Sequence, residues 1–240
     1  MSLRLASMIA AIFALSAANV EATLIDSFDR EDQFFSVSSK NHFNSDKVYP
    51  DSAIGGCRDV RLNWESGPRS NAEVVVPDPE VGNGFYFTQG AGGTAIATVV
   101  WDGEKDDSGV IAYDLNQDLT QGEADQFWLN ITNVTDGMQL KMTVYSSDGA
   151  LASATAPIQL SAGPTSLSIP YVNFSQQVLG GTSVDFHHVG AIVLELDGTH
   201  YAGSDISISS IQTVPEPSTL VLAAMGGVAF FGLRGRRRRA

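Results

Sequence analysis

The body of the chain is predicted to be all-β, folded as a two-sheet sandwich. Short runs of alternating apolar and polar residues recur between residues 23 and 213, separated by Gly, Asp, Asn and Ser. Such alternation is typical of strands that bury one face. Apolar residues at helical spacing are almost absent from this region. Roughly ten to twelve strands at this spacing indicate two sheets packed face to face.

The expected strands follow one another closely along the body. They cover residues 24–28, 60–64, 72–76, 84–88, 95–101, 110–115, 126–132, 138–145, 151–158, 192–197 and 206–208. The turn dipeptide Asp136-Gly137 predicts that 126–132 and 138–145 form a hairpin or meander pair. The glycine-rich segment 90–95 is interpreted as a hairpin loop, because no helix follows it to make a dinucleotide site. Only Ser175–Leu179 is expected to form a short helical turn.

Charge and cysteine content limit the classes of partner. The chain has 14 basic and 27 acidic residues. Outside the body lie Arg4, the five tail arginines, Glu21 and Glu216, which leaves 8 basic against 25 acidic residues and a net charge of −17. So acidic a body argues against nucleic acid and anionic lipid as partners. The lone Cys57 cannot form an internal disulfide and is expected to be a buried small side chain.

Residues 1–22 are predicted to be an export signal peptide. Arg4 gives a short basic start, and Leu5 to Ala18 is an apolar run of the length such signals need. Cleavage is expected before Thr23, with a cut after Ala18 as the alternative. Export through the Sec machinery is therefore expected, and an uncleaved anchor is the other interpretation.

The segment 214–240 is predicted to be a sorting signal rather than part of the fold. It contains Pro215, Glu216 and Pro217, an apolar run from Ser218 to Leu233, and a basic cluster of Arg234, Arg236, Arg237, Arg238 and Arg239. As a transmembrane helix the run would span roughly 24 Å, and arginines at its end could extend this by reaching the headgroups. By the positive-inside rule the arginines stay cytoplasmic and the body faces outward.

This tripartite tail resembles the PEP-CTERM signal of Gram-negative bacteria. The resemblance implies recognition in the inner membrane, processing by an exosortase, and delivery to the cell surface or the exopolysaccharide matrix. A tail that stays uncut would instead leave a membrane-tethered domain.

The body is similar to galactose-binding-like jelly rolls in the order of its landmarks. The mature chain opens with Leu24 to Phe28, Ser168 to Phe174 comes late, and Ser204 to Ile208 closes the body. The resemblance implies a jelly roll of the kind found in many carbohydrate-binding modules.

Catalytic signatures are largely missing from the sequence. No nucleophile elbow, zinc-protease motif, phosphate loop or cysteine pair occurs. The adjacent His187 and His188 would point to opposite faces of a strand and do not suggest a metal site. Glu195 and Asp197 share one strand face and are the best candidates for a glycosidase pair, although an exposed acidic face explains them more simply.

Two acidic clusters would suit a structural calcium ion, the only cofactor that the sequence suggests. One consists of Asp102, Glu104, Asp106 and Asp107, after Trp101, and the other of Asp26, Asp29, Glu31 and Asp32. Carboxylate oxygens are the ligands that calcium prefers. Exposed acidic turns are the alternative interpretation of both clusters.

Exposed aromatic side chains are the candidates for sugar binding, because their faces pack on the C–H faces of pyranose rings. Trp128 and Tyr145 lie on the polar sides of their strands, and Lys141 and Asn130 are near them in the sequence. These four residues are expected to form one platform. Trp64 and Tyr86 are weaker candidates.

We therefore expect an exported, non-catalytic surface or matrix protein that binds polysaccharide. A secreted glycosidase-like enzyme on the same sandwich is the competing hypothesis.

Overall fold

A computed structural model describes residues 22–29, 32–67, 70–76, 83–103, 110–135, 137–147, 152–178 and 184–215. The expected signal helix and tail helix lie outside these residues. Within them, no helix is both long and apolar enough to cross a membrane. The described residues form strands and three short 3₁₀ turns, which confirms the predicted all-β sandwich.

Fourteen strands make up the described part of the chain. They are β1 (Thr23–Asp26), β2 (Gln33–Ser38), β3 (Phe43–Val48), β4 (Arg58–Ser66), β5 (Asn71–Val76), β6 (Phe85–Gln89), β7 (Thr94–Trp101), β8 (Gln126–Val134), β9 (Gln139–Ser146), β10 (Ala152–Gln159), β11 (Thr165–Pro170), β12 (Ser175–Val178), β13 (Val189–Asp197) and β14 (Asp205–Val214). The 3₁₀ turns are η1 (Ile54–Gly56), η2 (Gln121–Glu123) and η3 (Tyr171–Asn173).

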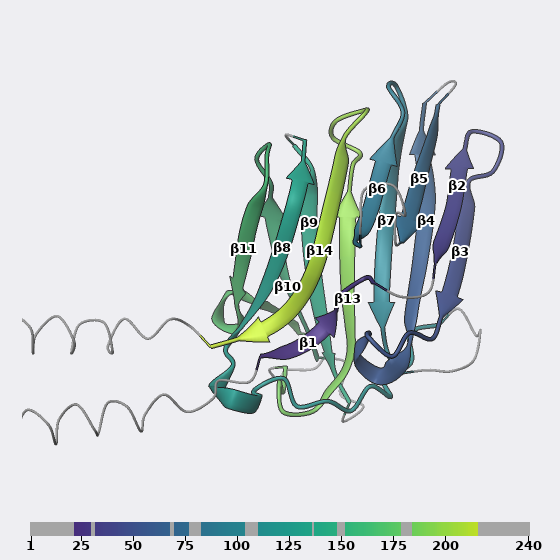
Figure 1. Cartoon of the computed structure of the whole chain (residues 1–240). Coiled ribbons are helices and arrows are strands. Elements are labelled where there is room, and N and C mark those ends of the chain that lie inside the picture. The colour runs from purple at the N-terminus through teal and green to yellow at the C-terminus, as the bar shows by residue number, and fades with distance from the viewer. Residues whose placement is uncertain are drawn as a thin grey trace, which may run out of the picture.

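The strands form two antiparallel sheets that pack face to face (Figure 1). One sheet, here called the β14 sheet, has the order β11-β8-β14-β6-β5-β2, and β1 also pairs with β14. The other, the β13 sheet, has the order β12-β10-β9-β13-β7-β4-β3. The chain crosses repeatedly between the sheets, as in a jelly roll.

The core fills the space between the two inner faces. In β8 the buried side chains are Phe127, Leu129 and Ile131, whereas Trp128 and Asn130 face outward. In β13 the buried Leu194 and Leu196 alternate with the outward Glu195 and Asp197. This period-2 burial is the pattern from which the fold class was predicted. Cys57 is buried, as expected.

The predicted hairpin between residues 126–132 and 138–145 is wrong. β8 belongs to the β14 sheet and β9 to the β13 sheet, so Gly137 lies in a connection that crosses from one sheet to the other. The glycine-rich segment 90–95 likewise connects β6 and β7 in different sheets and is not a hairpin loop. A turn dipeptide shows where a strand ends, but not which sheet the next strand joins.

Three other expectations about elements need correction. The expected strand at 110–115 does not form, and the nearby Gln117 makes an isolated bridge to Val189. The expected helical turn at 175–179 is replaced by β12, Ser175–Val178, which pairs with β10. The strands β2, β3 and β11 were not predicted.

Candidate functional site

The predicted sugar platform is divided between the two outer faces of the molecule. Trp128 and Asn130 lie on β8, and their side chains face outward from the β14 sheet. Lys141 and Tyr145 lie on β9, on the outer face of the β13 sheet. Because the core separates these faces, the four residues do not form one surface.

The weaker aromatic candidates also differ in position. Trp64 is only 5% exposed and packs in the core, so a ligand cannot reach its ring. Tyr86 is half-buried on β6, whose register pairs it with Val75 and Ser207 in the β14 sheet.

The calcium sites expected from the acidic clusters are not supported where the structure describes them. Asp102 is buried, and one of its carboxylate oxygens accepts a hydrogen bond from the Ala112 amide at 3.1 Å. Glu104, Asp106 and Asp107 lie outside the described residues. Among the described residues, no group of three or more His, Cys, Asp or Glu side chains is placed to hold a metal ion.

Asp26, from the other acidic cluster, belongs to a buried ion pair. Both of its carboxylate oxygens lie 3.1 Å from Arg58 Nη1, and Trp101 Nε1 donates to its Oδ2 at 2.9 Å. The Phe28 amide donates to Oδ1 at 2.8 Å, and Gln33 accepts from Arg58 Nε at 2.9 Å. Burial raises the pKa of Asp26, while the Arg58 guanidinium and the N–H donors offset part of this rise. Asp26 therefore ties β1 to β4 and β7, with its carboxylate already occupied.

The suggested glycosidase pair is also engaged by neighbouring side chains. Glu195 Oε1 lies 3.4 Å from Lys141 Nζ. Asp197 Oδ1 accepts hydrogen bonds from the amide and hydroxyl of Thr199, at 2.8 and 2.6 Å, and so closes the turn after β13. These contacts fit a half-buried acidic strand face whose carboxylates serve the fold.

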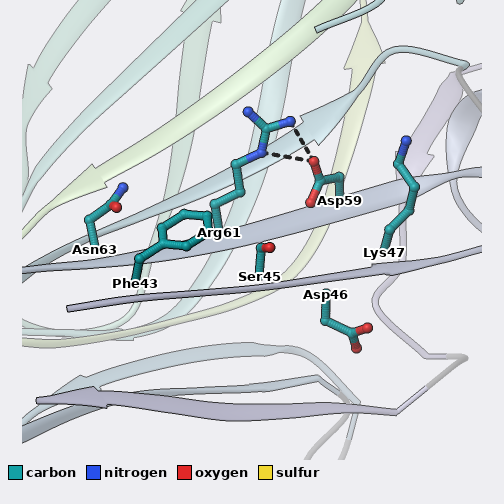
Figure 2. Close-up of a pocket in the computed structure, with 7 residues that line it drawn as sticks. All are labelled: Phe43, Ser45, Asp46, Lys47, Asp59, Arg61 and Asn63. Atoms are coloured by element: carbon teal, nitrogen blue, oxygen red, sulfur yellow. Dashed lines mark hydrogen bonds and ion pairs between the residues drawn. The ribbon is translucent and has the colours of Figure 1, made fainter. Parts of the chain in front are cut away.

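A hollow opens on the outer face of the β13 sheet, at its β3–β4 edge (Figure 2). It measures about 650 Å³ and is lined by Phe43, Ser45, Asp46, Lys47, Asp59, Arg61 and Asn63. The register places Phe43 beside Asn63, Ser45 beside Arg61 and Lys47 beside Asp59. Figure 2 shows these six side chains on one side of the ribbons, with Asp46 pointing to the other side.

One ion pair orders the polar side of this hollow. Arg61 Nε and Nη2 both donate to Asp59 Oδ2, at 2.8 and 2.6 Å. The Asp59 side chain is 8% exposed and that of Arg61 20%, so the pair is largely screened from water. Phe43, by contrast, is 53% exposed. The hollow therefore joins an accessible aromatic ring to a preoriented set of donors and acceptors.

The same face continues from the hollow across the β13 sheet. Register pairs Arg61 with Thr98, Thr98 with Glu195, and Glu195 with Lys141. Directly opposed residues in an antiparallel sheet point to the same side. Neighbouring strands lie about 4.8 Å apart, so this row from β4 to β9 spans roughly 14 Å.

A pair of tyrosines lies to one side of this row, further along β9. Tyr145 follows Lys141 on β9, and its ring centroid is 5.4 Å from that of Tyr113, at an interplanar angle of 53°. Burial raises the pKa of Tyr145, with smaller contributions from Tyr113 and Glu195. The Tyr145 phenol therefore remains a neutral hydrogen-bonding group near neutral pH.

The segment that carries Tyr113 can approach the sheet because residue 190 is glycine. The Leu115 amide donates to Gly190 O at 3.0 Å. A Cβ atom at Gly190 would lie 2.8 Å from Tyr113 O and 2.9 Å from Ser147 Cα. Both contacts are too close for any larger side chain without movement of the backbone.

Phe43 and Tyr113 were not predicted as site residues, because neither stands in a recognisable sequence pattern. Phe43 begins a strand whose other residues, Asn44 to Val48, show no apolar periodicity, and Tyr113 lies in a segment wrongly expected to be a strand. For Phe43, the indication in the sequence is an isolated aromatic residue among polar ones.

Comparison with solved structures finds loose similarity over most of the sandwich. A family 11 carbohydrate-binding module of a cellulosomal cellulase of Clostridium thermocellum has 12% identity and a TM-score of 0.41, over 82% of this chain and 96% of that one. TmCBM61, in complex with β-1,4-galactotriose, has 10% identity and a TM-score of 0.30, over 76% and 88%. An exo-β-agarase has 12% identity and a TM-score of 0.34, over 65% of this chain and 23% of that one.

Sequence comparison identifies the tail. The chain matches no curated protein. Residues 213–238 match the PEP-CTERM protein-sorting motif. Of the predicted sorting residues, Pro215 is described, whereas Glu216, Pro217 and the arginine cluster lie outside the described residues. The chain thus carries a PEP-CTERM sorting motif, which implies export and a surface or extracellular location.

Proposed function

We propose that this protein is a non-catalytic surface or matrix protein that binds a neutral polysaccharide on the outer face of its β13 sheet. The observation that carries the proposal is the hollow at the β3–β4 edge, where the exposed Phe43 ring lies beside the ordered Arg61–Asp59 pair.

The composition of this face suits a neutral sugar. An exposed aromatic ring offers an apolar surface to the C–H face of a pyranose, and few flexible bonds are ordered on binding. Carboxylate, guanidinium and amide groups such as those of Asp59, Arg61 and Asn63 can bond to adjacent hydroxyls. The body has a net charge of −17, which would repel a strongly anionic polymer.

The row from Arg61 to Lys141 gives the polymer a path. The row begins at the Phe43 hollow and ends at Lys141, and the Tyr113–Tyr145 pair lies further along β9 from Lys141, beside the same sheet face. We propose that several successive sugar rings lie along it, across the strands.

The proposed export to the surface is inferred from the sorting motif. We propose that the Sec machinery exports the chain, that the apolar run 218–233 holds it transiently in the inner membrane, and that an exosortase then processes the tail. No catalytic centre, metal or cofactor is needed for this role.

A glycan array and titration calorimetry test the binding proposal. Phe43→Ala should weaken binding of the selected glycan about tenfold, or about 1.4 kcal/mol. Phe34→Ala is the matched control, because Phe34 is 70% exposed on β2 in the other sheet. Equal binding by wild type and Phe43→Ala would contradict the proposed site, and selective loss in Trp128→Ala would move the site to the β14 sheet.

A further inference from the structure

The sorting motif begins inside the folded sandwich. The matched segment starts at residue 213, whereas β14 continues to Val214. Thr213 is fully buried and pairs with Phe127 on one side and Thr23 on the other. Val214 pairs with Gln126, and Val214 O accepts a hydrogen bond from the Asp125 amide at 3.3 Å. No spacer therefore separates the sandwich from Pro215.

Gln126 adds a contact between the sandwich and the next residue, Pro215. Its Nε2 donates to Pro215 O at 3.1 Å, and its Oε1 accepts a hydrogen bond from the Ser168 hydroxyl. The side chain of Gln126 is on the outer side of β8, yet the residue is only 3% exposed. Because Ser168 fixes its amide, Gln126 presents its donor to Pro215 in one orientation.

These contacts compete with any enzyme that takes the same residues in extended form. Enzymes and domains that bind extended peptides commonly use the main-chain N–H and C=O groups of the peptide. The main-chain oxygens of Val214 and Pro215 already accept hydrogen bonds from the sandwich. A segment bound in one place is available to a second binder only in the fraction of molecules that have released it.

We infer that the sandwich contains a binding site for the start of its own sorting motif, with Gln126 as the positioning residue, and that this site slows processing. The inference rests on the proposed processing by an exosortase. Residues 213–215 must separate from β8 and Gln126 before a membrane enzyme can bind them, so the folded domain sets the rate at which the motif becomes available.

Pulse–chase labelling of the full-length precursor in an exosortase-containing host tests this. Inserting Gly-Ser-Gly-Ser between Val214 and Pro215 should raise the initial processing rate at least threefold, because Pro215 and the residues after it then lie clear of the sandwich. Gln126→Ala should raise it in the same direction. Gln139→Ala, on β9 of the other sheet, is the matched control and should be processed at the wild-type rate.

The outcomes separate this inference from the proposed function. A wild-type chain that is never shortened, or is shortened equally without exosortase, contradicts both. A processed wild type with unchanged or slower processing of both the insertion variant and Gln126→Ala overturns the inference alone. Hydrogen exchange at the Asp125 amide should increase in Gln126→Ala at unchanged melting temperature. If that variant unfolds, the insertion variant, which leaves Gln126 intact, decides the result.

Discussion

At the residue scale, Asp26 shows how one acidic side chain can be misinterpreted from sequence. Its neighbours in the chain suggested a calcium site, but Arg58, 32 positions away, provides the positive charge. Composition does not show which cation a carboxylate will meet, because the fold brings distant residues together. The buried Asp26–Arg58 pair should nevertheless contribute measurably to the stability of the fold.

Asp26→Asn should lower the free energy of unfolding by about 3–5 kcal/mol, because it leaves the buried Arg58 guanidinium without an anion. Urea denaturation followed by tryptophan fluorescence measures the change. Glu65→Gln removes an exposed carboxylate from β4 and should change stability by less than about 0.5 kcal/mol. A loss of less than about 1 kcal/mol in Asp26→Asn would show that the ion pair does not stabilise the fold.

At the element scale, period-2 patterns predicted β8, β9 and β13 well, because each buries one face against the core. The pairing of those strands was not predictable, since the same alternation fits a partner in either sheet. The sugar platform failed for that reason: Trp128 and Tyr145 lie on strands adjacent in sequence but in opposite sheets. The edge strand β3, mostly half-buried or exposed, lacked the apolar face on which the prediction depends.

The close approach of segment 110–117 to β13 can be tested by substituting Gly190. Gly190→Ala would place a Cβ atom 2.8 Å from Tyr113 O, and both atoms are fixed to backbone, so the segment must move away from β13. We expect a loss of roughly 1–3 kcal/mol from overpacking, together with faster hydrogen exchange at the Leu115 and Gln117 amides. Glycan binding should weaken as Tyr113 leaves Tyr145. Unchanged exchange at both amides would show that residue 190 does not control this approach.

For the whole molecule, the proposed binding face and the point of exit lie at different places. β1 and β14 pair at Thr23 and Thr213, so the mature chain would begin and the tail would leave at the same end of the sandwich. The β3 strand lies at the opposite edge (Figure 1). A domain held at a membrane through its tail could therefore still present the Phe43 hollow outward. Retention in the membrane and glycan binding should therefore be alterable independently of each other.

That separation can be tested through the charge of the tail. Replacing Arg234 and Arg236–Arg239 with alanine should let the apolar run pass through the membrane, since about 24 Å of helix is short for a core of about 30 Å without flanking cations. The variant should appear in the medium at its unprocessed mass, with glycan binding intact. Replacement of the same residues with lysine keeps the charge and should restore retention and processing. If the lysine variant behaves like the alanine variant, charge is not what holds the tail, and the guanidinium groups themselves are recognised.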